Sequence, residues 1–552
     1  MSTGSSPLIA HELLQGFLAP EPVAPSRLQR LLPSSGTLPG ITRLGGHHPL
    51  VHVLVSGLRS CGQVIFINNP LSGLLLLLAM ALQSFWASGL TLLGIVAAHL
   101  FARAIGADRQ TRRNGIYGFN GALVGSAVAC FADLDPAAAR PWLWLLLVLL
   151  GAGVTTLLVH GLGRWLVRFF ALPPLTLPFC LVTWVLLLLA SALAHPELSL
   201  QQASQPEAVR GPLLALLQAL PTGFGQVFLL PGLLSGTVVL LAVAIASPLA
   251  ALVGLAGGLV GGATGLLMGA PAAAVAQGLW SYNGVLSAIA VAGVFYPLTR
   301  LSLLAGLAAA AFSSVLTMPL AASLGLLTGA GQPLPLLTLP FIVATLLTLL
   351  VLRRTQPALV PVGLHSILTP EEHRHRFDVA RRLMADFRRQ LRGSLAGDRY
   401  PSLLAEAEPA QVAELEALFG SLDRNRDRRL SVSELATGLE DRAVGIAGVG
   451  QEQLALVLAA IDLDGDGSVD VVEFSELMLR LRRLRAGEER LLQYLLPIDG
   501  DGNDRLDASE LNRLLRSVGQ PPLEPREQHQ LFGDQALRGL SWKQFLDRLL
   551  LI

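Results

Sequence analysis

Charged side chains are nearly absent from the middle of this 552-residue chain. Between Arg210 and Arg353 the one charged residue is Arg300. A water-soluble domain of that length would carry many charges, whereas a set of bilayer-spanning helices would not. From about residue 353 onward Arg, Asp and Glu become dense, and the apolar residues take helical spacing. We therefore expect a membrane region followed by a water-soluble region.

Cysteine is scarce too, with Cys61, Cys130 and Cys180 the three in the chain. None has the spacing of a zinc or redox motif, and all lie in or beside apolar segments, so we expect buried free thiols. Residues 1–48 lack the basic stretch followed by an apolar stretch that a cleaved signal peptide requires. We expect them to form an N-terminal tail.

Acidic residues are missing from the apolar segments themselves. Within residues 49–352 they fall in predicted loops: Asp108, Asp133, Asp135, Glu197 and Glu207. Carriers that couple transport to protons or sodium usually keep an ionisable group inside the bilayer. The lack of one favours an uncharged solute. No catalytic constellation appears either, so we do not expect an enzyme.

What is present is a repeat, because residues 63–179 recur from residue 226 onward. Gln63-Val64 returns as Gln226-Val227, and Phe119-Asn120-Gly121 returns as Tyr282-Asn283-Gly284. A duplicated membrane domain commonly builds a pathway on a pseudo-two-fold axis between its halves. The repeat therefore predicts where a solute would pass.

Apolar runs predict five helices in each copy. The first set lies near 50–67, 71–84, 86–104, 142–160 and 175–193, and the second near 213–229, 233–247, 249–266, 303–320 and 338–352. Shorter pieces at 118–131 and 281–294 predict re-entrant half-helices beginning at Asn120 and Asn283. An odd number of helices inserts the copies with opposite orientation. We expect an all-α, polytopic membrane domain over 49–355, with inverted five-helix repeats at about 49–205 and 206–355.

The basic residues bear on orientation. Arg353 and Arg354 favour a cytoplasmic C-terminus at a cell membrane under the positive-inside rule. Ten crossings then place the N-terminus on the same side. By the same count the Arg-rich loop 103–113 falls on the opposite side, against that rule.

Polar residues inside the apolar segments come in uncharged, repeat-related pairs. Gln63 pairs with Gln226, Thr176 with Thr338, and Asn120 with Asn283, each beside a helix break or a proline. Apolar neighbours that can form a flat slot are Phe66, Phe119, Leu123, Tyr282 and Leu286. A buried Gln or Thr often joins helices and touches no solute. Pairing by the repeat favours a slot for a small planar amide.

These residues resemble the urea transporter family. The segment from Gln63 to Gly73, the Phe119-Asn120-Gly121 turn with Leu123, and the Leu-Thr-Leu-Pro-Phe segments at 175–179 and 337–341 follow that family's signature in order and spacing. The resemblance implies a homotrimer with one pore per subunit and passive, channel-like urea permeation. It implies slot walls at Phe119 with Leu123 and Tyr282 with Leu286, a central constriction at Thr176 and Thr338, and Gln63, Phe66 and Gln226 beside the path.

The second copy departs from that signature where Asn68-Asn69-Pro70 aligns with Pro231-Gly232-Leu233. Two amide side chains are absent there, and Tyr282 adds a hydroxyl where the first copy has Phe119. Selectivity for other small amides or ammonia stays open on this ground.

The C-terminal region carries EF-hand loops. Residues 462–473 have oxygen side chains at the ligand positions, Gly467 at the bend and Glu473 placed for bidentate binding. A loop from Asp423 has Arg428 at the bend, which predicts weaker binding, and a loop from Asp499 has Asp504 there. The predicted calcium ligands are Asp423, Asn425, Asp427, Ser431, Glu434, Asp462, Asp464, Asp466, Ser468, Asp470, Glu473, Asp499, Asp501, Asn503, Arg505, Asp507 and Glu510.

A fourth unit near 533–544 keeps Leu540 but has Gln544 in place of the last ligand, so we expect a structural partner. Residues 411–552 thus resemble a soluble, α-helical, calmodulin-like domain of four hands. The linker, 356–410, contains a basic amphipathic helix from His373 to Arg392 that suits such a groove or an anionic membrane surface. A solvated spacer helix is the alternative.

The sequence therefore predicts a passive channel for urea or a close neutral amide, with a cytoplasmic calcium-binding tail expected to regulate it. Two alternatives stay open. One is a calcium sensor or scaffold with a non-conducting membrane domain, and the other is an ammonia or ion channel.

Overall fold

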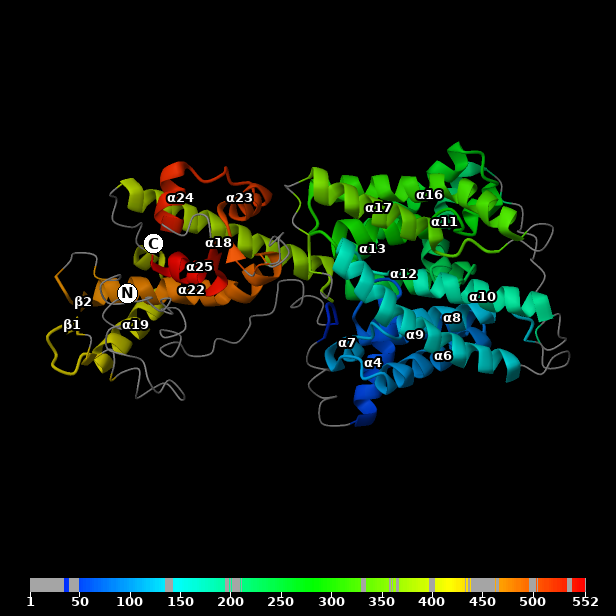
Figure 1. The fold of residues 1–552 in the computed structure, drawn as a ribbon, viewed down its shortest axis with the longest axis horizontal. Coiled ribbons are helices and arrows are strands. Elements are labelled where there is room, and N and C mark those ends of the chain that lie inside the picture. Colours follow the sequence, from blue (N-terminus) through cyan, green and yellow to red (C-terminus); the bar gives the residue numbers. More distant parts are fainter. Residues whose placement is uncertain are drawn as a thin grey trace. The chain divides into compact units, whose positions relative to one another are not determined.

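The computed structural model divides into two compact units, Pro25–Arg374 and His375–Ile552 with Met1–Ala24. It describes residues 34–38, 49–134, 142–193, 211–328, 334–356, 367–396, 403–431, 466–495, 505–533 and 539–551, with isolated residues between these ranges. We call Pro25–Arg374 the membrane unit, and we call His375–Ile552 with Met1–Ala24 the C-terminal unit. Both are built almost wholly of helices, as the sequence predicts (Figure 1).

The two copies of the repeat have matching helices. The first copy contains α4 (Pro49–Gln63), α5 (Pro70–Gln83), α6 (Phe85–Ala104), α7 (Arg109–Arg113), α8 (Phe119–Phe131), α9 (Trp142–Phe170) and α10 (Leu177–Leu193). The second contains α11 (Pro212–Gln226), α12 (Leu233–Ala246), α13 (Pro248–Leu267), α14 (Ala272–Ala276), α15 (Tyr282–Ile289) with a π-helical turn (Ala290–Val294), α16 (Arg300–Thr328) and α17 (Leu339–Thr355). By length and composition α6, α9, α13 and α16 can cross a membrane.

Glycine brings the helices of each copy into close contact. A Cβ on Gly94 of α6 would lie 2.1 Å from the carbonyl oxygen of Gly121 in α8. At the repeat-related position, a Cβ on Gly257 of α13 would lie 2.5 Å from the carbonyl oxygen of Gly284 in α15. Both distances are too short for any side chain, so the backbones can approach this closely only at glycine. The short helices α8 and α15 are held in place by this packing.

Helix α4 runs along one end of the membrane unit. Near its start, the His52 ring accepts a hydrogen bond from the Arg113 guanidinium at 2.7 Å, and at its end the Gln63 side chain donates to the carbonyl of Asn114 at 3.2 Å. Both ends of α4 therefore touch the same short loop, and the helix stands crosswise to α6 and α9 in Figure 1. This position does not favour the expectation that the first apolar run crosses the bilayer. We infer that the crossing segments of this copy are α5, α6, α8 with the turn before it, α9 and α10. A crossing segment thus replaces the re-entrant half-helix expected at 118–131, and the re-entrant role falls to α4.

The Arg-rich loop lies at the same end as the end of α17. Helices α6 and α9 run parallel, because Ala98 packs near Ala152 while Ile105, further along, packs near Val159. The Arg353 guanidinium at the end of α17 donates to the carbonyl of Phe170 at the end of α9, at 3.3 Å. The count that placed the Arg-rich loop opposite the C-terminus is wrong because it included α4. Both basic segments thus lie at one end of the membrane unit, in agreement with the positive-inside rule.

The C-terminal unit contains most of α18 (Pro370–Ala396), a short 3-10 helix (Leu403–Glu406), α19 (Pro409–Leu422), α22 (Val471–Leu495), α23 (Ala508–Ser517), α24 (Pro525–Phe532) and α25 (Trp542–Leu551). Two short antiparallel pairs of strands join its loops. Strand β1 (Arg429–Leu430) pairs with β2 (Val469–Asp470), and β3 (Arg505–Leu506) pairs with β4 (Leu540–Ser541). The loops starting at 423 and 462 thus form one pair, and those starting at 499 and 533 form another.

Candidate permeation pathway and calcium loops

The two copies meet at a pair of threonines. Thr176 precedes α10, Thr338 precedes α17, and their hydroxyl oxygens are 2.7 Å apart. The Cys180 thiol lies 3.3 Å from the Thr338 hydroxyl. Each threonine is 4% exposed, which places the pair deep in the membrane unit. A hydroxyl has two lone pairs and one proton, so this pair can still accept a hydrogen bond from a passing N–H group.

The backbone before each threonine is left-handed. Leu175 has a φ of 48° and Leu337 a φ of 50°, although neither is glycine. Such a conformation costs roughly 1–2 kcal/mol per residue. It turns the chain sharply at two repeat-related positions, so α10 and α17 begin in the interior of the unit.

The paired asparagines support these turns. The Asn120 side chain accepts a hydrogen bond from the Phe179 N–H at 3.1 Å and donates to the Leu175 carbonyl at 3.4 Å. In the second copy, the Asn283 side chain accepts from the Phe341 N–H at 3.3 Å. The asparagines thus fix the first turns of α10 and α17 and do not face the cavity described next.

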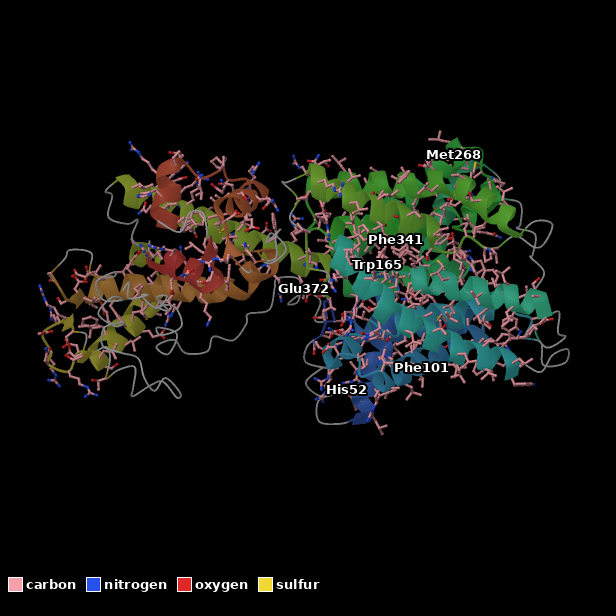
Figure 2. The ribbon with its side chains drawn as sticks, viewed as in Figure 1. His52, Phe101, Trp165, Met268, Phe341 and Glu372 are labelled. Atoms are coloured by element: carbon pink, nitrogen blue, oxygen red, sulfur yellow. The ribbon has the colours of Figure 1, made fainter. Side chains whose placement is uncertain are left out.

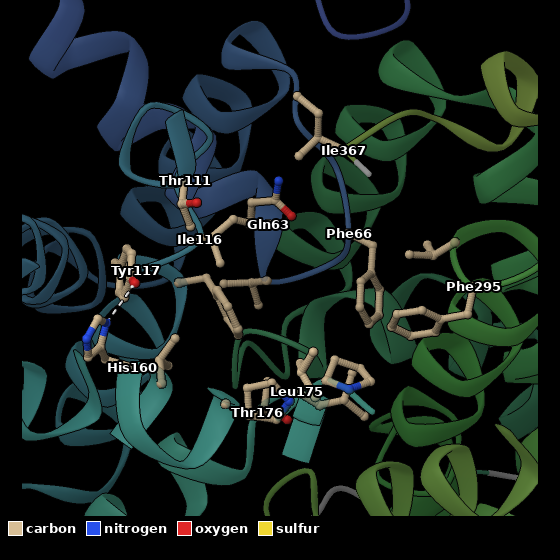
Figure 3. Close-up of a pocket in the computed structure, with 18 of the residues that line it drawn as sticks. Gln63, Phe66, Thr111, Ile116, Tyr117, His160, Leu175, Thr176, Phe295 and Ile367 are labelled. Atoms are coloured by element: carbon tan, nitrogen blue, oxygen red, sulfur yellow. Dashed lines mark hydrogen bonds between the residues drawn. The ribbon is translucent and has the colours of Figure 1, made fainter. Parts of the chain in front are cut away.

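A cavity of about 490 Å³ leads from one end of the unit to Thr176 (Figure 3). Of the residues predicted to line the path, Gln63, Phe66, Phe119 and Thr176 line this cavity. The others are buried and are not among its lining residues: Leu123, Gln226, Tyr282, Leu286 and Thr338. Among the described lining residues Asp108 is the one acidic side chain, and it lies in the loop before α7.

An aromatic cluster forms one wall of the cavity, and the sequence did not reveal it. The Phe66 ring lies 6.2 Å from the Phe295 ring and 6.1 Å from the Phe341 ring, centroid to centroid, in edge-to-face contact. Figure 2 shows Phe341 in the interior of the membrane unit. The three phenylalanines come from different elements of both copies, so no sequence spacing links them. Phe66 and its repeat-related Leu229 again have left-handed backbones, with φ of 62° and 61°.

The asparagines that the second copy lacks have structural roles. The Asn68 side chain donates to the Asn114 carbonyl at 2.7 Å. The Asn69 side chain caps α5 by accepting from the Ser72 N–H at 3.1 Å, and it donates to the carbonyls of Ser34 and Gly36 at 2.8 Å each. They tie the first copy to α7 and to residues 34–38. Tyr282, by contrast, uses its added hydroxyl to donate to the Leu337 carbonyl, beside Thr338.

The loop starting at Asp423 forms a compact turn in which the carboxylates at its two ends accept backbone N–H groups. The Asp423 carboxylate accepts the N–H groups of Asp427 at 3.2 Å and Arg428 at 2.9 Å, and the Glu434 carboxylate accepts those of Arg424 and Asn425. Burial acts to raise the pKa of Glu434, but hydrogen bonds from Ser431 and from the backbone outweigh it and hold that pKa below its ordinary value. Glu434 is therefore ionised, as a ligand must be.

Arginine strains this loop, as the sequence suggested. Arg426 and Arg428 have φ of 61° and 65°, in the region that favours glycine. Arg429 reaches across to the next loop, where its guanidinium pairs with the Asp466 carboxylate.

The other loops show the same turn in their described parts. The Asp462 carboxylate accepts the N–H groups of Asp466 at 3.1 Å and Gly467 at 2.7 Å, and Gly467 has a φ of 83°. In the third loop Asp507 and Glu510 form a reciprocal capping box at the start of α23. Of the remaining predicted ligands, Ser468, Asp470, Glu473, Asn503 and Arg505 are described, while Asp464, Asp499 and Asp501 lie outside the described residues. Within the described ranges no three His, Cys, Asp or Glu side chains form a metal-ligating cluster.

Helix α18 is anchored to the last two hands within the C-terminal unit. The Arg388 guanidinium donates to the Glu527 carboxylate at 2.9 Å, with these side chains only 3% and 1% exposed, and to the Pro522 carbonyl at 2.8 Å. Arg392 pairs with the same carboxylate at 2.9 Å. Phe387 packs against Phe545 of α25, with ring centroids 6.1 Å apart. Burial acts to raise the pKa of Glu527, but its hydrogen bonds and the two arginines hold it below the ordinary value.

Comparison with known sequences supports both parts. The family model described as Urea transporter matches residues 54–353, and that described as EF hand matches residues 454–478. Urea transporter 1 of Ovis aries is 30% identical over 325 residues, which are 57% of this chain and 81% of that protein. Urea transporter 1 of Rattus norvegicus is 31% identical with the same coverage. The probable calcium-binding protein CML17 of Oryza sativa subsp. japonica is 38% identical over 77 residues, which are 14% of this chain and 45% of that protein.

The fold and the site define a helical membrane protein of the transporter class, with a duplicated, predominantly apolar membrane region and a helical tail of EF-hand type. Since the Urea transporter family model covers more than half of the chain, the chain belongs to the urea transporter family.

Proposed function

We propose that this protein is a passive, channel-like pathway for urea or a close small neutral amide. The observation that carries this proposal is the convergence of repeat-related polar groups at Thr176 and Thr338, where both copies begin a helix in the interior. An aromatic-walled cavity leads to that point. Its described wall includes Gln63, Phe66 and Phe119 as proposed path residues, and Leu123, Gln226, Tyr282 and Leu286 are proposed to complete the path beyond it.

The chemistry of urea fits such a path. Urea has N–H donors on both nitrogens, and removing their water costs several kcal/mol unless acceptors replace it. Threonine hydroxyls and carbonyls freed at broken helices supply acceptors without charge. Aromatic walls hold a flat molecule edge-on toward those acceptors. Charged side chains such as Asp108 line the outer part of the cavity, but an ion would find no compensating charge in the threonine pair and would keep its water.

We further propose that the two copies lie inverted in the membrane and that three chains assemble. Support for inversion comes from the contacts of α5 and α12, where the Ser72 hydroxyl donates to the Ala242 carbonyl at 2.6 Å and the Ser235 hydroxyl donates to Gln83 at 3.1 Å. The start of each helix thus meets the end of the other. The trimer rests on the family, and a cytoplasmic side for the shared basic end rests on the positive-inside rule at a cell membrane.

Urea flux tests the transport proposal. Proteoliposomes containing the full chain should shrink and recover faster than empty vesicles when mixed with urea in a stopped-flow instrument. Thr338→Val should lower urea permeability about two- to tenfold, since a neutral hydrogen bond contributes about 0.5–1.5 kcal/mol. Thr348→Val is the matched control, because that hydroxyl bonds within its own helix to Ala344. Full flux in Thr338→Val would remove the threonine pair from the path, and no flux in the parent protein would favour a non-conducting sensor.

We also propose that the loops starting at 423, 462 and 499 bind calcium through their predicted ligands and that binding regulates flux. The turned loops, the paired strands and the ionised Glu434 support this. Isothermal titration with calcium should show binding that Glu473→Gln weakens by at least about tenfold, because it removes the bidentate ligand. If that variant abolishes binding at its loop while the calcium response of urea flux is unchanged, this loop has no regulatory role.

A further inference from the structure

The chain does not leave the membrane unit where α17 ends. Beyond it, the Val362 N–H donates to the Phe295 carbonyl at 2.8 Å, and Leu359 is buried in the main apolar core. Ile367 and Leu368 then line the same cavity as Phe66 and Phe295 (Figure 3). All of these added residues lie outside residues 54–353, the part that matches the family. The cavity thus has a wall that the family domain alone does not supply.

A single carboxylate fastens this segment. Glu371 accepts the Ser247 hydroxyl at 2.5 Å with one oxygen and the Leu249 N–H at 2.7 Å with the other. Ser247 is the N-cap of α13, so the carboxylate sits at the positive end of a twenty-residue helix. Both hydrogen bonds are charge-assisted and part-buried, which makes this contact stronger than an ordinary surface contact. Pro370, the preceding residue, packs directly over Gly293.

The fastened segment begins a helix that also belongs to the calcium-binding unit. Thr369 caps α18, with its N–H donating to the Glu372 carboxylate at 2.8 Å. From there α18 continues without a break to Ala396 and supplies Arg388 and Arg392 to Glu527. One continuous helix therefore carries the Glu371 contact at its start and the anchor to the hands near its end.

We propose that residues 367–372, which we call the vestibule strap, form a displaceable wall of the solute cavity that calcium binding controls through α18. Ile367 and Leu368 narrow the cavity, and Glu371 holds them in place. The structure shows the strap docked on the cavity wall, and we assign to calcium the release of this docked position, so that calcium raises flux. The expected effect on urea flux rests on the proposed function. The docking of the strap and its release by calcium do not.

Accessibility of the strap tests the proposal without any solute. Ile367→Cys, in a Cys130→Ser background, places a thiol on the cavity wall while Cys61 and Cys180 stay buried. We expect a membrane-impermeant maleimide to label the full chain slowly without calcium and at least about tenfold faster with it, a change equivalent to about 1.4 kcal/mol. Adding Glu371→Gln should give the fast rate without calcium. Adding Glu414→Gln should leave labelling slow, because that carboxylate pairs with Arg482 at the surface and lies outside the strap. Equal rates in all of these proteins would overturn the proposal.

Urea flux supplies the second arm. Glu371→Gln should raise calcium-free flux to the level of the parent protein with calcium, and Ile367→Ala with Leu368→Ala should do so too. Size-exclusion profiles matching the parent establish that the variants are folded. If no protein passes urea while labelling still follows calcium and Glu371, the proposed function fails and the strap stands. If flux is present but neither flux nor labelling responds to Glu371→Gln, the strap is a fixed wall and the proposal fails alone.

Discussion

The membrane unit and the C-terminal unit are both helical, yet different forces hold their decisive contacts. In the membrane unit helices meet through glycine and through uncharged pairs such as Thr176 with Thr338. In the C-terminal unit α18 is fixed by a buried ion pair, Arg388 with Glu527. A bilayer supplies no water to a charge, so the helices of the first unit meet by close approach and neutral hydrogen bonds. The charged contacts of that unit, such as Arg113 with His52 and Glu371 with Ser247, lie at its ends. The second unit can bury an ion pair. Substitutions and pH should therefore affect the two units differently.

The largest effect should come from Glu527→Gln. The substitution leaves the buried Arg388 guanidinium without its counter-charge, which costs about 3–5 kcal/mol. Thermal unfolding of the full chain, followed by fluorescence, should show the C-terminal unit melting first, with the membrane transition unchanged. Glu524→Gln is the control: its carboxylate is 66% exposed, and loss of such a surface pair costs about 1 kcal/mol or less. Equal shifts for the two variants would contradict the comparison.

Gly94→Ala should be the strongest single test within the membrane unit. The added methyl would meet the Gly121 carbonyl oxygen, and a backbone atom cannot rotate away, so we expect about 3 kcal/mol of destabilisation or loss of the folded unit. Gly89→Ala in the same helix meets nothing within 4 Å and should be neutral or slightly stabilising. Yield of monodisperse protein and its melting temperature in detergent measure both. A folded Gly94→Ala protein with an unchanged melting temperature would show that the close approach does not matter.

Asn69→Ala tests a difference between the two copies. It should lower the free energy of unfolding by less than Gly94→Ala does. Loss of the helix cap alone costs about 1 kcal/mol, and two further hydrogen bonds to residues 34–38 are lost with it. The repeat-related Gly232→Ala should be tolerated, because the new methyl meets mainly the ends of the Gln83 and Ser235 side chains. Melting temperatures of the two variants give the comparison. If Gly232→Ala proves the more harmful, the asparagines are not what holds the first copy.

Lowering the pH should destabilise the C-terminal unit more than the membrane unit. This effect should be the smallest and the most gradual. The Glu527 carboxyl has a pKa held below its ordinary value of 4.5. Its contribution to folding is complete above that ordinary value and is lost as pH falls through the lowered one. Thermal scans at decreasing pH should show the C-terminal transition falling in this window. In Glu527→Gln the fall in the C-terminal melting temperature through this pH window should disappear. If the fall persists in that variant, other groups cause the acid sensitivity.

The sequence predicted the helical content, the repeat and the EF-hand units, but it misjudged α4 and missed the contacts that only tertiary packing makes. Thr176 and Thr338 could be paired in advance because each stands in the same five-residue motif, and the contact between them follows. Helix α4 was misjudged because apolar content alone does not separate a helix lying along one end from one that crosses. Phe295, Phe341 and the strap residues Ile367 and Leu368 could not be found, since they join the cavity only through tertiary packing.

The left-handed residues have a consequence for engineering. Phe66 and Leu229 occupy equivalent positions with φ of 62° and 61° but bear unlike side chains. The duplication has therefore preserved a chain trajectory while the group presented at that position diverged. Positions of this kind are suitable for redesign. The two copies already carry an aromatic and an aliphatic side chain at equivalent positions with the same backbone conformation.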